Sequence, residues 1–238
     1  MIDLQASIDA VNRAKICARN YAETPVPAEL VSHLATVALG GPFKQGRRYF
    51  DVYTITDPEK TKQIWAHTAR PDEAAALVAY PKLNKDGTQA TFVGNAQVLA
   101  PALFLFAYLE EPTPPYPEED HWNPTDFDIS DENEQNARFA VGSAMGMLTF
   151  EANRQGLHSG CCVCFDPDPI TALVKEWSGR DDFLNIGLMV GTGYPVNPQW
   201  RGDTGAGLQM RKHPIVSGHV YEPPRPGDRG DPQHYVIT

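Results

Sequence analysis

The spacing of apolar and polar residues predicts helices that alternate with short strands. Apolar side chains recurring every three or four residues predict amphipathic helices over residues 1–20, 28–39 and 134–155. Runs of β-branched, aromatic and other apolar residues predict strands over 49–56, 101–109 and 185–193, with a buried strand or extended loop at 159–165. Asp57-Pro58 and Asp168-Pro169 each place a capping carboxylate before a first-turn proline, so two further helices are expected there.

This interleaving of helices and strands favours an α+β or α/β architecture with helices packed on a sheet. The chain has 238 residues, of which 42% are hydrophobic and 21% charged, an ordinary composition for a globular protein. We expect a single domain over 1–238. It carries an irregular insert at 111–134 and an extended C-terminal arm, rich in proline and glycine, at 221–238.

The negative charge of the chain is concentrated in the insert at 111–134. This segment holds nine acidic residues, five prolines and no lysine or arginine, and it accounts for nearly all of the net charge of -10. The five prolines predict a surface loop. Because nucleic-acid binding needs a basic face, the charge balance argues against a nucleic-acid partner. It still allows local basic clusters that hold a small anion.

Hydropathy and cysteine spacing indicate a cytoplasmic protein. No apolar run approaches the roughly 18 residues that a membrane span requires, so no membrane association is expected. The first residues lack the basic and apolar segments of a secretory signal. Three of the four cysteines lie at 161, 162 and 164, a spacing unlike the disulfide framework of a secreted domain.

The cysteine cluster has three possible interpretations. Cys161 and Cys164 have the spacing of a redox dithiol, but such pairs normally lie at a helix N-terminus, and this region is predicted to be extended. His158 and the three cysteines could supply four zinc ligands, but Cys161 and Cys162 would point to opposite sides of a strand. We favour small residues that line a pocket wall and assign no metal ligand. A thiol-redox or metal-binding module stays as the alternative.

Basic residues gather in three segments. Lys15 and Arg19 are four residues apart, so they would share one face at a helix end, where they could hold a phosphate or complement the helix dipole. The loop at 43–48 and the pair Arg211-Lys212 supply further cations. The G-x-G at 191–193 lacks the third glycine and the following helix of a dinucleotide-binding turn.

Taken in order, these segments resemble the nitroreductase family, whose members bind FMN. Residues 15–21 (K-I-C-A-R-N-Y) stand where that family has R-R-S-x-R-x-[FY], before a P-V-P turn at 25–27. Residues 37–46 correspond to its A-x-x-A-P-S-x-x-N loop, and G-L-H-S at 156–159 leads through small residues to F-D at 165–166. Gly193-Tyr194-Pro195 and Arg211-Lys212 complete a resemblance that spans about 8–215.

The resemblance implies a fold, an assembly and an activity. The fold would be a central, mostly antiparallel sheet flanked by helices. Two chains would form an intertwined homodimer, with the helix at 134–155 in its core, the arm wrapping the partner and the acidic insert bordering the active-site mouth. The activity would be that of an FMN-dependent oxidoreductase. NADH or NADPH would reduce FMN, which then reduces a small electron-poor acceptor, such as a nitroaromatic or a quinone, in a ping-pong cycle.

The resemblance also implies a cofactor site. Lys15, Arg19, Arg211 and Lys212 would hold the FMN phosphate, Asn95 the flavin pyrimidine edge, and residues 161–163 the isoalloxazine, with a backbone N–H near Val163 facing N5. Cys17 and Gly46 replace a family serine and asparagine, which keeps a flavin-binding protein without turnover as a further alternative. No catalytic side chain is implied, because the flavin does the chemistry. The cofactor-binding set is Lys15, Cys17, Arg19, Lys44, Gln45, Gly46, Asn95, Cys161, Cys162, Val163, Arg211 and Lys212.

Overall fold

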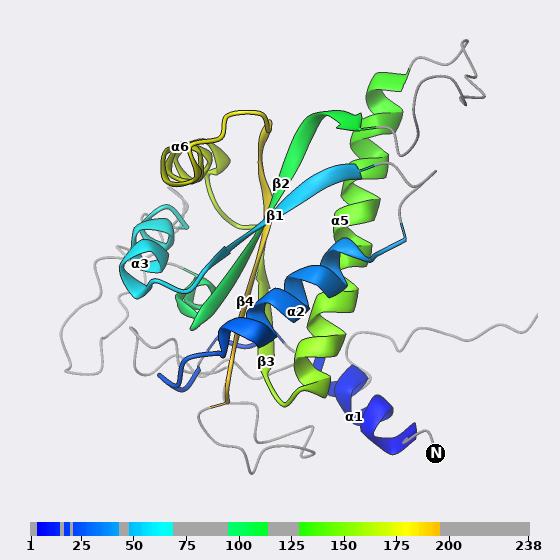
Figure 1. The fold of residues 1–238 in the computed structure, drawn as a ribbon, viewed down its shortest axis with the longest axis vertical. Coiled ribbons are helices and arrows are strands. Elements are labelled where there is room, and N and C mark those ends of the chain that lie inside the picture. The colour runs from blue at the N-terminus through cyan, green and yellow to red at the C-terminus, as the bar shows by residue number, and fades with distance from the viewer. Residues whose placement is uncertain are drawn as a thin grey trace, which may run out of the picture.

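The computed structural model is drawn in Figure 1 and describes residues 4–14, 17–19, 21–42, 48–68, 95–113 and 129–195. The C-terminal arm at 221–238 and most of the acidic insert lie outside the described residues. Among the helices that the structure describes, none combines the length and the apolarity needed to span a membrane.

The described core is a four-stranded sheet in the order β1-β2-β4-β3. Its strands are β1 (Arg48–Ile55), β2 (Ala102–Thr113), β3 (His158–Cys162) and β4 (Asn185–Gly193). All three strand pairs are antiparallel, with Phe106 opposite Val52 on β1 and Leu188 on β4. The mostly antiparallel sheet predicted from the sequence is therefore confirmed.

Helices cover both faces of the sheet (Figure 1). On one face lie α2 (Ala28–Leu39) and the long α5 (Ile129–Arg154), and α1 (Leu4–Ala14) packs against α5. On the other lie α3 (Pro58–Ala66), the short 3-10 helix η2 (Ala96–Leu99) and α6 (Pro167–Ser178). The predicted arrangement of helices around a sheet is confirmed.

Strand β2 builds both halves of the core because its side chains alternate between the two faces. Phe104 and Phe106 pack in the cluster with α2 and α5, whereas Leu103 and Leu105 pack in the cluster with α3 and α6. All four side chains are fully buried. Each contributes about 1.5–3 kcal/mol relative to leaving it exposed, which explains why the central strand reads as a continuous apolar run.

Capping residues fix where α3 and α6 begin. Asp57 accepts a hydrogen bond from the backbone N–H of Glu59 (2.8 Å), as predicted. Helix α6 begins one Asp-Pro pair earlier than predicted, because Asp166 is its cap and Pro167 occupies its first position. The helix ends where expected, at Gly179, which has a φ of 66°.

Two further predictions of element boundaries are wrong. The first helix does not reach residue 20, because Cys17–Arg19 is not helical and the backbone N–H of Ala18 instead bonds the carbonyl oxygen of Ser159 (2.8 Å). Arg19 therefore does not lie on a face of this helix. The acidic insert is also shorter than predicted, since β2 continues to Thr113 and α5 begins at Ile129.

A carboxylate network joins α2 to α5. Glu151, 7% exposed, contacts Arg154 (2.7 Å), Gln155 (2.7 Å) and His33 of α2 (3.0 Å). Hydrogen bonds from Arg154, Gln155 and His33 hold the pKa of Glu151 at about 2, below its ordinary 4.5. The folded state therefore favours the ionised carboxyl, and the stability that this supplies is present above about pH 4.5 and lost as the pH falls towards about 2.

We therefore expect Glu151→Gln to lower the free energy of unfolding at neutral pH and to flatten its fall between about pH 4.5 and 2. Urea unfolding followed by circular dichroism across this range measures both effects. Glu134→Gln, an exposed carboxylate on the same helix, is the matched control. An identical loss of stability at acidic pH in wild type and Glu151→Gln would contradict the assignment.

Candidate functional site

The segment Cys17–Arg19 lies along the outer side of β3. The backbone bond from Ala18 to Ser159 fixes its position, and the hydroxyl of Tyr21 lies 3.1 Å from the carbonyl oxygens of both Ala18 and Gly191. A Cβ at Gly160 would lie only 2.1 Å from the carbonyl oxygen of Ala18. Glycine at 160 is therefore what allows the segment to approach the sheet.

The chain continues from this segment to the end of β4. The backbone N–H of Ala22 donates to the carbonyl oxygen of Tyr194 (2.8 Å), and Tyr21 pairs with Pro195 in an antiparallel bridge. The N-terminal motif and the Gly-Tyr-Pro turn, which are far apart in the sequence, are thus neighbours in the fold.

The side chain of Gln97 reaches from η2 to the end of β3. Its side-chain Nε2 donates to the carbonyl oxygen of Cys161 (3.1 Å). The side chain is 4% exposed, and its Oε1 has no hydrogen-bond partner among the residues that the structure describes. Because an unpaired buried carbonyl is costly, Oε1 is a candidate acceptor for a donor that is not part of these residues.

The cysteines of β3 differ in exposure because neighbouring side chains of a strand point to opposite sides. Cys161 is exposed and Cys162 is 2% exposed, so the two point to opposite sides of β3 as predicted. The thiol of Cys17 donates a hydrogen bond to the carbonyl oxygen of Cys161 (3.4 Å). The interaction between the two cysteine side chains, and burial next, raise the pKa of Cys17, whereas the same interaction lowers the pKa of Cys161 to about 6. Burial raises the pKa of Cys162 to about 12.

Arg19 lies close to both cysteines and also lines a cavity of about 610 Å³. Its positive charge lowers the pKa of Cys161 and opposes the rise in the pKa of Cys17. The volume lies within the range of about 300–1,000 Å³ that is typical of small-molecule sites. The cavity is lined by Arg19, Tyr21, Ala22, Glu23, Pro25, Val26, Thr56, Pro58, Thr61, Ala96, Leu99, Ala100 and Pro101.

Asn95 holds the loop that follows β3. Its Nδ2 donates to the carbonyl oxygens of Thr68 (3.2 Å) and Cys164 (2.7 Å), which uses both amide hydrogens. Beside this loop the side chain of Val163 is 64% exposed, an unusual position for a large apolar residue at the end of a buried strand. The loop therefore presents a fixed and partly apolar surface.

The structure brings together half of the predicted cofactor-binding set. Cys17, Arg19, Asn95, Cys161, Cys162 and Val163 lie on or beside β3. Lys15, Lys44, Gln45, Gly46, Arg211 and Lys212 lie outside the described residues. Gln97 and Tyr21 were not predicted as site residues. A lone amide between apolar Ala96 and Val98 was the available signal for Gln97.

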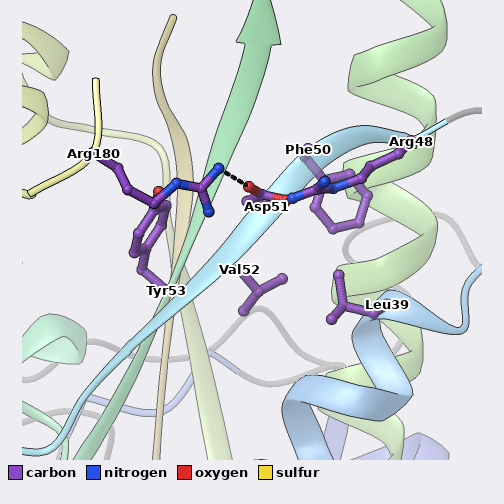
Figure 2. A pocket seen from close by; sticks show the side chains of 7 residues that line it. All are labelled: Leu39, Arg48, Phe50, Asp51, Val52, Tyr53 and Arg180. Carbon is purple, nitrogen blue, oxygen red and sulfur yellow. Dashed lines mark hydrogen bonds and ion pairs between the residues drawn. The ribbon is translucent and has the colours of Figure 1, made fainter. Parts of the chain in front are cut away.

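A second cavity, of about 510 Å³, lies on β1 and is shown in Figure 2. Asp51 lies there between two arginines, with Arg48 on one side and Arg180, 3.2 Å away, on the other. Arg180 also pairs with Asp182 (2.6 Å). None of the predicted cofactor-binding residues that the structure describes lines this cavity, whereas Arg19 lines the first one, so we favour the Arg19 cavity as the functional site.

In the part of the chain that the structure describes, no group of three or more histidine, cysteine, aspartate or glutamate side chains is placed to hold a metal ion. The Cys161–Cys164 segment therefore has no described set of zinc ligands around it.

No known protein family and no curated protein matches the sequence of this chain. Its structure is similar to the BluB-like flavoprotein from Clostridium difficile (TM-score 0.57, 16% identity), with 83% of this chain and 92% of that chain covered. It is also similar to nitroreductase A from Vibrio parahaemolyticus (TM-score 0.55, 14% identity, 81% and 69% covered). A third match is the hypothetical oxidoreductase YcnD from Bacillus subtilis (TM-score 0.54, 16% identity, 97% and 75% covered). The chain has a nitroreductase-like fold.

Proposed function

We propose that this chain, with its nitroreductase-like fold, is an FMN-dependent oxidoreductase that takes hydride from NADH or NADPH and reduces a small electron-poor acceptor. The observation that supports it most is the position of Arg19. This residue lines a cavity of about 610 Å³, and its charge also acts on Cys161 of β3, in the segment 161–163 where the sequence resemblance implies a flavin ring. The names of the structural neighbours, a flavoprotein and a nitroreductase among them, support the same reading.

The described residues fit the chemistry of FMN. A phosphate needs a cation, which Arg19 supplies, together with Lys15, Arg211 and Lys212 if the family resemblance holds for those positions. The apolar rings need an uncovered apolar surface, and Val163 offers one. The polar edge of the flavin carries a ring N–H, and the unpaired Oε1 of Gln97 is an acceptor for such a group. Cys17, in place of the family serine, still lies beside Arg19.

When bound, FMN supplies the hydride chemistry, and the protein supplies position and electrostatics. Arg19 would hold the phosphate and keep the cofactor's orientation. Gln97 would fix one edge of the cofactor, while Asn95 holds the carbonyl oxygen of Cys164 and so keeps the loop after β3 rigid. We assign no proton transfer to a side chain of this site.

Turnover assays test this proposal. The purified protein, reconstituted with FMN, is mixed with NADH or NADPH and either a quinone or a nitroaromatic. We expect acceptor reduction that requires FMN and shows the parallel double-reciprocal lines of a ping-pong cycle. FMN binding without any oxidation of NADH or NADPH would favour a flavin-binding protein without turnover.

We further propose that the protein is a homodimer that pairs through the outer face of α5. Phe139 is 69% exposed and Met147 is 37% exposed on this helix. A Cβ at Gly142 or Gly146 would meet nothing within 4 Å, so the same face has room for a closely packed partner. Exposed apolar residues beside small ones are typical of a helix–helix interface.

Phe139→Glu should then convert the dimer to a monomer, because a charge would be buried without a partner in the interface. Size-exclusion chromatography with light scattering measures the mass. Glu134→Gln, which lies on the same helix and keeps the apolar face intact, is the control and should remain dimeric. A monomeric wild-type protein would contradict the proposed assembly.

A further inference from the structure

Two thiols that are far apart in the sequence meet at the surface of this site. Cys17 and Cys161 are 144 residues apart, yet the thiol of Cys17 donates a hydrogen bond to the carbonyl oxygen of Cys161 (3.4 Å). Their separation is fixed from both sides, by the Ala18–Ser159 backbone bond and by the close approach at Gly160. The sequence had suggested Cys161 and Cys164 as the pair, whereas the fold places Cys17 against Cys161.

We propose that Cys17 and Cys161 are an oxidisable dithiol, which hydrogen peroxide converts to a disulfide that ties the segment after α1 to β3.

The two thiols have unequal roles. Cys161 is exposed, so peroxide can reach it, whereas Cys17 is half-buried. The neighbouring side chain of Cys17 and the charge of Arg19 both lower the pKa of Cys161, so it is the member that ionises first. Because the thiolate is the reactive form of cysteine, Cys161 is the attacking thiol and Cys17 the resolving one.

The two other cysteines are less suited to this reaction. Cys162 is 2% exposed and points into the core, and burial raises its pKa to about 12, which keeps it protonated. Cys164 lies past the end of β3, and its backbone carbonyl is held by Asn95 (2.7 Å). Cys17, by contrast, contacts Cys161 directly, through its thiol and the carbonyl oxygen of Cys161 (3.4 Å).

The reaction balances with one molecule of peroxide. The thiolate of Cys161 attacks one peroxide oxygen, so that an S–O bond forms, the O–O bond breaks and the hydroxide that leaves becomes water on taking a proton. Cys17 then attacks the sulfur of the resulting sulfenic acid. An S–S bond forms, the S–O bond breaks, and the leaving hydroxide takes the proton of Cys17 to become the second water. Two thiols lose two electrons, and a thiol reductant reverses the change.

Peptide mapping tests the proposal directly. The reduced full-length protein is treated with about one to ten equivalents of hydrogen peroxide, and the remaining thiols are counted after denaturation. We expect the count to fall from the four cysteines of the chain to two. Digestion without reductant should then yield a Cys17 peptide linked to a Cys161 peptide, and dithiothreitol should restore all the thiols.

Three single variants assign the roles. Cys164→Ser should still form the Cys17–Cys161 link. Cys17→Ser should accumulate sulfenic acid at Cys161, which dimedone traps. Cys161→Ser should slow the oxidation of Cys17 by about tenfold or more, because the ionised thiol is gone. A link between Cys161 and Cys164, a covalent dimer through Cys161, or an unchanged thiol count at ten equivalents would each overturn the proposal.

Discussion

Arg19→Ala is expected to weaken FMN binding by about tenfold or more. A hydrogen bond to a charged group contributes about 1.5–3 kcal/mol, and Arg19 is the cation that the described structure places at the cavity of about 610 Å³. The loss should appear as a higher dissociation constant, with little change in the far-ultraviolet circular dichroism spectrum. Titration of apo-protein with FMN, followed by quenching of flavin fluorescence, measures it.

Arg180→Ala is the matched control for this experiment. It also removes one arginine, but from the second cavity, where Arg180 pairs with Asp51 and Asp182 (Figure 2). Its FMN affinity should equal that of the wild type. If Arg180→Ala weakens binding more than Arg19→Ala does, the phosphate lies at the other cavity and the assignment is wrong.

Gly160→Ala is expected to destabilise the protein and to damage the site. The added Cβ would lie 2.1 Å from the carbonyl oxygen of Ala18 and 2.9 Å from Cβ of Gln97, and neither neighbour is the end of a flexible side chain. Overpacking of this kind typically costs about 1–3 kcal/mol. The segment that carries Cys17 and Arg19 should move away from β3, so FMN affinity should fall together with stability. Urea unfolding and the FMN titration measure the two effects.

Gly40→Ala controls for the change of residue type. Gly40 has a φ of -81°, and its added Cβ would make an ordinary contact of 3.4 Å with the carbonyl oxygen of Thr36. Its stability should stay within about 0.5 kcal/mol of the wild type. Equal stabilities for Gly160→Ala and wild type would show that the close approach of the two segments is not what positions the site.

The sequence predicts most of the fold because the signals are local. The apolar run before Leu109, the capping Asp57 and the terminating Gly179 each act within a few residues, and the structure confirms all three. Errors arose where local signals were ambiguous. The repeat D-P-D-P at 166–169 offers two equivalent helix starts, and the first one is used.

The site was harder to predict because tertiary contacts create it. Helical spacing around Lys15 suggested a helix through Arg19, but pairing of Ala18 with β3 overrides that preference. The neighbour of Cys161 lies 144 residues away, and no spacing rule within the Cys161–Cys164 segment could reveal it. The roles of the predicted residues therefore stay predictions, although Cys17, Arg19 and Cys161 do meet in space.

Equilibrium binding of FMN to the wild-type protein decides whether this site holds a flavin. Apo-protein is titrated with FMN and, in parallel, with riboflavin, which has the same ring system without the phosphate. We expect saturable binding of FMN, with riboflavin bound at least about tenfold more weakly because the contact with Arg19 is lost. No saturable binding of FMN, or equal affinity for both, would contradict the assignment.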